Sequence, residues 1–303
     1  NYYPIFNQFI IILIIIMNTK ITLLLILALL SVSTAPIIGR ALTGVGAISI
    51  SFWRMLFACI ILWFFSVMKP QGKMKVSTNL NRTICAGILL GIHFALFFEA
   101  VKITKIANAT FLGTLAPFFT LLVEFFILKR YYNKKVLLGL FCTLMGSLII
   151  LGYQFDLETK YTLGNLYAIL CSLSIAAALM IGEKVRENEN TIVYTRTLYL
   201  SASITLFLIA LIANEKLTDY NLNEYLGLLF LGLVPTILGH NSIYYSIRYV
   251  SPTIAAAFPL GEPIIATILA YFIFSEMITF NILLGGAVTL LGLLLISIYK
   301  KLK

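Results

Sequence analysis

The sequence predicts an all-α polytopic membrane protein with ten transmembrane helices, arranged as an inverted 5+5 repeat. The first observation behind this prediction is composition, because 60% of the 303 residues are hydrophobic and 11% are charged, whereas soluble domains carry about 25% charged residues. The second is that the apolar residues fall in long runs, and a helix needs about 20 such residues to cross a bilayer. The third is an internal repeat.

The predicted spans follow one another along the chain, and each coincides with one apolar run. The connectors between them are short and carry helix breakers, as in "KPQGKMKVSTNLNR" and "ANEKLTDYN". None is long enough for an independent soluble domain. The spans lie near residues 20–39, 47–68, 83–101, 107–128, 136–153, 162–182, 192–213, 224–246, 253–274 and 281–299.

Residues 1–16 are expected to be an N-terminal extension. The apolar run Phe6–Ile16 precedes Met17, and the next run, "ITLLLILALLSV", follows at once. A single helix over both would be about 45 Å long, more than the hydrocarbon thickness of about 30 Å. We therefore expect Met17 to be the natural start, with one five-helix repeat at 17–155 and a second at 156–303.

The internal repeat becomes visible when the sequence is shifted by 146 residues. Residues 97–152 then fall on 243–298 without a gap, and Pro117 falls on Pro263. Because each repeat has an odd number of spans, the second must lie upside down in the membrane relative to the first. Inverted repeats of this kind are a signature of transporters.

The net charge of +10 is explained by membrane topology, so no nucleic-acid partner is expected. With the N-terminus inside, the cytoplasmic connectors and termini hold about sixteen Lys and Arg residues, and the outer ones about five. The connector "KRYYNKK" at 129–135 is basic, whereas its repeat counterpart "SEMITFN" at 275–281 is not. We therefore expect both termini on the cytoplasmic side of a prokaryotic inner membrane.

The four cysteines all lie in apolar runs, and no two of them have a CxxC spacing. They are interpreted as small packing residues, so neither disulfides nor a metal site is expected. No cofactor is expected either.

Two segments carry a family resemblance. They are His93–Phe119, "HFALFFEAVKITKIANATFLGTLAPFF", and Leu238–Glu276, "LGHNSIYYSIRYVSPTIAAAFPLGEPIIATILAYFIFSE". With the inverted repeat, they resemble the EamA-like permeases of the drug/metabolite transporter superfamily, nearly throughout the chain from Met17. The resemblance implies secondary transport of small metabolites, often amino acids or related compounds. The sequence departs from the family pattern at Lys129-Arg130, where the first repeat usually ends with Gly-Glu.

Glu262 is the first candidate site residue. An acidic side chain near the middle of a span costs roughly 3 kcal/mol, so it is expected to face a cavity or a partner. It would then couple transport to protons or bind a substrate ammonium; the alternative is a neutral carboxyl that only packs. Gly261, Pro263 and the repeat-related Pro117 break helices, and paired breaks indicate a midplane binding site. The alternative is two inherited kinks.

The remaining candidates are polar or basic residues inside spans. His93 and His240 nearly coincide under the repeat and suit proton relay or anion recognition, although lone membrane histidines often only pack. Arg54 falls on Arg196 at an offset of 142, and the pair is expected either at the two mouths of the transport path or snorkelling to headgroups. Asn108 is a lower-ranked polar candidate.

Two further features bear on packing. Glu124 has no acidic repeat counterpart and is expected to pair with a basic residue or to lie at an interface. Gly87 and Gly91 form a GxxxG pattern that permits close helix packing, so a homodimer is an open alternative.

The sequence therefore predicts a secondary transporter of a small polar metabolite, working by alternating access around a midplane site, with protons as the candidate coupling ion and membrane lipid around it. One alternative is a non-transporting sensor or assembly subunit of the same fold. A membrane-embedded enzyme is the other, but none of the HExxH, GxSxG or Walker motifs is present.

Overall fold

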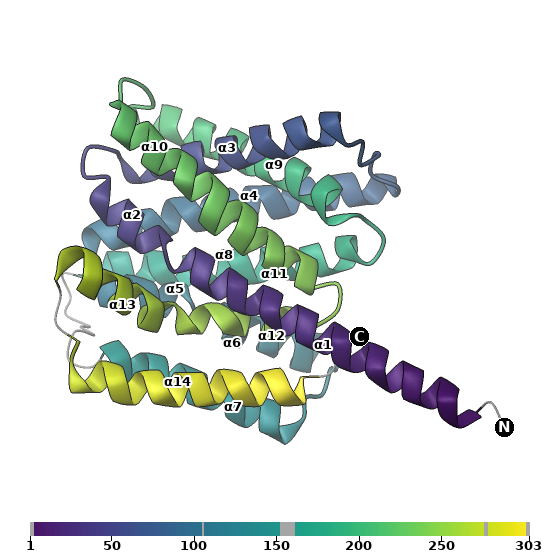
Figure 1. Ribbon diagram of the computed structural model, residues 1–303. Coiled ribbons are helices and arrows are strands. Elements are labelled where there is room, and N and C mark those ends of the chain that lie inside the picture. Colours follow the sequence, from purple (N-terminus) through teal and green to yellow (C-terminus); the bar gives the residue numbers. More distant parts are fainter. Residues whose placement is uncertain (1–2, 105, 152–160, 276–277, 301–303) are drawn as a thin grey trace.

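The computed structural model describes residues 3–104, 106–151, 161–275 and 278–300, without the side chains of 3–16, 106–108 and 151. All regular structure within these ranges is helical (Figure 1). The elements are α1 (Tyr3–Val32), α2 (Ala35–Ala41), α3 (Ala47–Met68), α4 (Ser77–Ile103), α5 (Ile106–Gly113), α6 (Ala116–Leu122), the π-helix η1 (Val123–Ile127), α7 (Lys134–Leu151), α8 (Thr162–Arg186), α9 (Thr191–Ile212), α10 (Leu222–Leu231), the π-helix η4 (Gly232–His240), α11 (Asn241–Ser246), α12 (Pro252–Ala257), the 3₁₀-helix η5 (Phe258–Gly261), α13 (Glu262–Phe274) and α14 (Phe280–Tyr299).

These elements confirm the predicted polytopic helical fold. Nine helical segments of the described residues are long and apolar enough to cross a membrane. The first of them, Met17–Ala41, joins most of α1 to α2. The remaining predicted span, 136–153, corresponds to α7, which packs along α14. Helix α1 is continuous from Tyr3, and its first turns project beyond the bundle in Figure 1; that residues 1–16 are an extension stays a prediction.

Besides the first span, three spans are broken into consecutive short helices. The fourth consists of α5, α6 and η1, the eighth of α10, η4 and α11, and the ninth of α12, η5 and α13. Pro117 lies in the first turn of α6 and Pro263 in the first turn of α13. A proline has no backbone N–H and therefore fits the start of a helix but interrupts its interior. The breaks fall immediately before the two repeat-related prolines.

The contact between α7 and α14 shows how the two repeats are related. A Cβ added to Gly146 would lie 2.6 Å from the carbonyl oxygen of Gly285, and one added to Gly292 would lie 2.6 Å from that of Gly139. The repeat shift converts one contact into the other. Because the residue numbers rise along one helix as they fall along its partner, the two helices are antiparallel, as an inverted repeat requires.

Other helix contacts also occur in pairs, in which each contact has a counterpart between the repeat-related helices. Helix α4 of the first repeat packs on α8, and the related η4 and α11 of the second repeat pack on α1. The fourth-span helices α5 and α6 also pack on α8, whereas η5 and α13 of the ninth span pack on α1. Helices α7 and α14 lie side by side along one edge of the bundle in Figure 1. The remaining spans therefore enclose the interior in which the candidate site lies.

Candidate functional site

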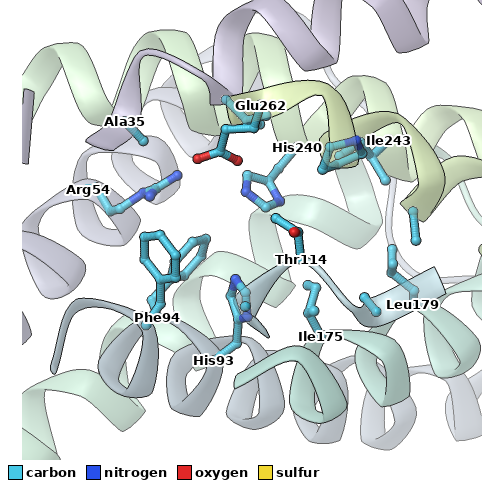
Figure 2. Close-up of a pocket in the computed structure, with 16 residues that line it drawn as sticks. Ala35, Arg54, His93, Phe94, Thr114, Ile175, Leu179, His240, Ile243 and Glu262 are labelled. Atoms are coloured by element: carbon cyan, nitrogen blue, oxygen red, sulfur yellow. The ribbon is translucent and has the colours of Figure 1, made fainter. Parts of the chain in front are cut away.

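A cavity of about 90 Å³ lies in the middle of the bundle, between the two repeats. Its polar lining residues are Arg54 of α3, His93 of α4, Thr114 beside the α5–α6 break, His240 of η4 and Glu262 of α13. Figure 2 shows Arg54, His93, His240 and Glu262 pointing toward one another. The space admits several water molecules, since about 10–15 Å³ already admits one.

Arg54 is held rigidly at one wall of the cavity. Its guanidinium carbon lies 4.1 Å from the centre of the Phe94 ring, and its Nε donates a hydrogen bond to Thr236 Oγ1 at 3.2 Å. Only 2% of the residue is exposed. Stacking on an aromatic face and a fixed donor geometry are what a guanidinium needs to bind a planar anion. Both partners of Arg54 are neutral, so its charge is not neutralised by them.

Glu262 approaches from the opposite wall, with its carboxylate directed toward Arg54 in Figure 2. It is the first residue of α13, and an acid there interacts favourably with the helix dipole. Among the described residues, none donates a hydrogen bond to this carboxylate, and no cation lies within 4.0 Å of it. The cavity therefore contains a guanidinium and a carboxyl group that face each other without forming an ion pair.

The two histidines line the same cavity and flank one phenylalanine. The rings of His93 and Phe94 are 4.7 Å apart, and those of Phe94 and His240 are 5.3 Å apart. His93 Nδ1 lies 3.1 Å from the carbonyl oxygen of Cys171. Cys171 Sγ lies 3.1 Å from the same nitrogen, so Nδ1 either donates to the carbonyl or accepts from the thiol, depending on the tautomer.

The helix-breaking candidates surround the cavity without lining it. Pro117, Gly261 and Pro263 are buried, but the lining residues are their neighbours, among them Ala116 and Pro259. Their contribution is to end helices at mid-depth, which brings polar side chains and backbone to the cavity wall. The side chain of Asn108, in α5, lies outside the described residues.

Arg196 does not reach the cavity. Its guanidinium carbon lies 4.5 Å from the centre of the Trp63 ring, and its Nη2 donates to the carbonyl oxygen of Gly72 at 2.6 Å. It therefore fastens the connector between α3 and α4. The structure separates the two arginines that the sequence aligned.

The close glycine contacts explain this separation. A Cβ on Gly232 would lie 3.2 Å from the carbonyl oxygen of Arg54, and one on Gly87 would lie 2.6 Å from that of Leu198. Gly87 and Gly232, which are 145 positions apart, make equivalent contacts in the two repeats. The residues that they contact, Leu198 and Arg54, are then equivalent too, whereas the sequence alignment had paired Arg54 with Arg196. A difference of two residues turns a side chain by about 200° around its helix, so Arg196 faces another direction.

The structure contains a buried charge network that the sequence did not predict. Only the pairing of Glu124 with a basic residue was expected. Arg130 Nη1 lies 2.7 Å from Glu124 Oε1 and 2.8 Å from Glu183 Oε1. The hydroxyls of Tyr132 and Thr253 donate to Glu124. These contacts join four parts of the chain: η1, α8, α12 and the connector that precedes α7. The signal in the sequence was Lys129-Arg130, the position where the chain departs from the family pattern.

Two members of this network, Arg130 and Tyr132, have pKa values shifted by their surroundings. Burial disfavours the charge on Arg130, but hydrogen bonds to Glu183 and Glu124 outweigh it and raise the pKa of Arg130 above its ordinary value. Burial and the neighbouring Glu124 charge raise the pKa of Tyr132, so its hydroxyl stays a donor. The network therefore joins the fourth, sixth and ninth spans in this conformation.

Comparison with known proteins follows the same division into two repeats. The model of the EamA-like transporter family matches residues 18–152 and 162–298. The chain belongs to the EamA-like transporter family. This confirms the resemblance drawn from the sequence, and it identifies the chain as an integral membrane protein of a transporter family. Arg54 and His93 lie in the first matched segment, and His240 and Glu262 lie in the second.

Relatives with known names are transporters. The chain is 24% identical over 277 residues to an uncharacterized transporter of Archaeoglobus fulgidus, covering 89% of this chain and 94% of that protein. It is 26% identical over 282 residues to an S-adenosylmethionine uptake transporter of Rickettsia bellii, covering 92% and 93%. It is 23% identical over 211 residues to the pseudopaline exporter CntI of Pseudomonas aeruginosa, covering 69% and 72%.

One solved crystal structure matches the fold closely. The TM-score is 0.80 at 16% sequence identity, over 91% of this chain and 96% of that chain. At this identity the match supports the arrangement of the EamA helices and carries no information on substrate.

Proposed function

We propose that this protein is a secondary transporter of a small zwitterionic metabolite, such as an amino acid or a related compound, and that it binds the solute in the central cavity. The observation that carries the proposal is the placement of the Arg54 guanidinium and the Glu262 carboxyl group, which face each other across the cavity without contact. Membership of the EamA-like transporter family supports the transport role.

The energetics of the cavity favour a solute with both charges. Leaving an ionised group buried without a partner costs several kcal/mol, and Arg54 and Glu262 both lie deep in the bundle, at 2% and 9% exposure. A carboxylate bound to Arg54 and an ammonium bound to Glu262 would relieve both costs in one step, through charge-assisted hydrogen bonds. A solute with one charge would relieve only one of them.

The rest of the lining suits the body of such a solute. Phe97, Ile175 and Leu179 form apolar wall beside the charged pair, so an aliphatic or aromatic group can be buried next to the two ends. S-adenosylmethionine, the compound named for the Rickettsia relatives, carries an α-ammonium and a carboxylate. That chemistry is compatible with the proposed class and does not identify the solute.

Alternating access would operate around this cavity. Both inverted repeats contribute polar lining residues, three from the first and two from the second, so rocking of one repeat against the other would expose the same residues to either side. We place both termini in the cytoplasm and the protein in a prokaryotic inner membrane, because Lys and Arg gather on that side. His93, His240 and Glu262 are the candidate carriers of a coupling proton.

The test is uptake into proteoliposomes that contain the purified protein, with an imposed pH gradient. The panel comprises amino acids, S-adenosylmethionine, monoanionic and monocationic analogues, and nucleosides. We expect uptake of at least one zwitterion above protein-free liposomes, and no comparable uptake of its singly charged analogues. Uptake of no zwitterion under any gradient would reject the proposal, and binding without uptake would favour the sensor alternative.

A further inference from the structure

A second cavity of about 480 Å³ opens at the ends of several helices, away from the central one. Its walls are the second half of α1, the end of α8, the start of α9 and the end of the eighth span. Three basic residues line it: Lys20, Arg186 and Arg248. Among the described residues, no aspartate or glutamate lines this cavity, so its charge is strongly positive.

Arg186 forms the rigid floor of the cavity. Only 1% of the residue is exposed, and its Nε donates to the carbonyl oxygen of Tyr244 at 3.0 Å, while its Nη2 donates to Thr191 Oγ1 at 2.6 Å. A third bond goes to the carbonyl oxygen of Glu189. All of these acceptors are neutral, so the guanidinium is positioned by them without being neutralised.

The buried acid Glu189, three residues after Arg186, binds groups outside the cavity. The carboxylate of Glu189 accepts hydrogen bonds from the backbone N–H groups of Lys75 and Val76, at 2.9 Å and 3.0 Å, and from the Asn79 side chain. It therefore binds the start of α4, while only its backbone carbonyl turns toward Arg186. The basic cavity gains no counter-charge from it.

The other two cations stand at the rim with aromatic hydroxyls between them. Lys20 Nζ lies 5.4 Å from the centre of the Tyr245 ring, and the hydroxyls of Tyr245 and Tyr249 are 3.4 Å apart. Lys20 and Arg248 are exposed, and within the described part of the chain no carboxylate lies within 4.0 Å of either. Three cations and two tyrosine hydroxyls, of which Tyr249 donates to Tyr245, thus converge on one space.

We propose that this second cavity binds a phosphate group, supplied either by an anionic phospholipid headgroup or by a soluble phosphorylated compound. Phosphate is the anion that a fixed guanidinium, a mobile ammonium and hydroxyl donors recognise together. The cavity lies on the face predicted to be cytoplasmic, where basic pockets between membrane helices meet anionic headgroups. Its lining also includes Leu24 and Ile192, which suits the start of an acyl chain.

The experiment uses the purified full-length chain in detergent. Retention of added lipid is measured by native mass spectrometry and thermal unfolding is measured in parallel, with phosphatidylglycerol, phosphatidylcholine or inorganic phosphate as the probe. We expect phosphatidylglycerol to be retained and to raise the unfolding temperature, and phosphatidylcholine to do neither. A Lys20→Gln/Arg248→Gln double variant should bind about tenfold more weakly. Both residues are exposed, so the variant is expected to fold.

The matched control is Lys184→Gln, which removes an exposed lysine of α8 that does not line the cavity. It should retain phosphatidylglycerol like the wild type. Stabilisation by inorganic phosphate that the double variant loses would identify a soluble phosphate as the occupant, and stabilisation by phosphatidylglycerol alone would identify a lipid. Equal retention of phosphatidylcholine, or unchanged behaviour of the double variant toward both anions, would overturn the proposal. None of these readouts depends on transport.

Discussion

Replacing Glu262 by glutamine is expected to reduce solute transport at least tenfold while the protein still inserts and folds. Glutamine has nearly the same shape, so the packing at the start of α13 is preserved. The substitution removes the only carboxylate among the described lining residues of the central cavity. A hydrogen bond between charged groups contributes about 1.5–3 kcal/mol, and each 1.4 kcal/mol is about tenfold in affinity.

Initial uptake rates in proteoliposomes, at equal amounts of reconstituted protein, provide the measurement. The control is Glu187→Gln, which changes an exposed acid after the end of α8, outside the cavity; its uptake should equal that of the wild type. If Glu262 also carries the coupling proton, the Glu262→Gln variant should lose the response to an imposed pH gradient. Wild-type rates with a wild-type pH response in this variant would rule out both roles for Glu262.

The second large effect is expected at the contact between the two repeats. Gly146→Ala should destabilise the protein by about 1–3 kcal/mol, the usual cost of overpacking, because the new Cβ would lie 2.6 Å from the carbonyl oxygen of Gly285. The Thr289 side chain can rotate, but the backbone atoms of Thr289 and Gly285 cannot move without shifting the whole helix. Gly292→Ala should have a similar effect, because the repeat places its Cβ 2.6 Å from the carbonyl oxygen of Gly139.

Thermal unfolding in detergent measures this effect, and the helix itself supplies a control. At Gly286, the nearest atoms to an added Cβ belong to Ile264 and lie 3.8 Å away. Gly286→Ala should therefore leave the unfolding temperature nearly unchanged. A pair of helices that tolerated Gly146→Ala and Gly292→Ala as well as Gly286→Ala would not be in the close antiparallel contact described above.

The fold could be predicted largely from sequence, because the bilayer imposes a simple rule. Spanning helices must be apolar for about 20 residues, so their number and order appear directly in the apolar runs. The shift of 146 residues also agrees with the α7–α14 contact, which the sequence did not predict, since Gly139 and Gly146 map onto Gly285 and Gly292. The π-helix around Pro235 was not anticipated, because a proline within a span does not reveal which local geometry will accommodate it.

The candidate site was predicted in part for a related reason. Charged and titratable residues inside spans are few, so Glu262, His93, His240 and Arg54 stood out, and the structure brings them to one cavity. Their roles in transport stay predictions. Arg196 shows the limit, because a two-residue error in aligning the repeats points a helical side chain the opposite way.

The charge network and the second cavity lay beyond sequence reasoning altogether. Arg130 bonds to Glu183, 53 residues away along the chain, and Lys20 lines a cavity with Arg248. Such meetings depend on how distant helices are rotated and displaced, which no periodicity within one helix specifies. Composition showed that cations gather on one side of the membrane, but only the packed helices show which of them share a cavity.

If solute and water reach the cavity between the two inverted repeats, a thiol placed at position 114 must react with reagents dissolved in water. In a chain whose native cysteines have been replaced, Thr114→Cys lines the cavity (Figure 2), whereas Phe141→Cys occupies a position that is 59% exposed on the outer surface of α7. We predict that a membrane-impermeant thiol reagent modifies Thr114→Cys, that the transported solute slows this reaction, and that Phe141→Cys stays unreactive within the bilayer. A Thr114→Cys as inert as Phe141→Cys, or one whose labelling no solute slows, would contradict the account.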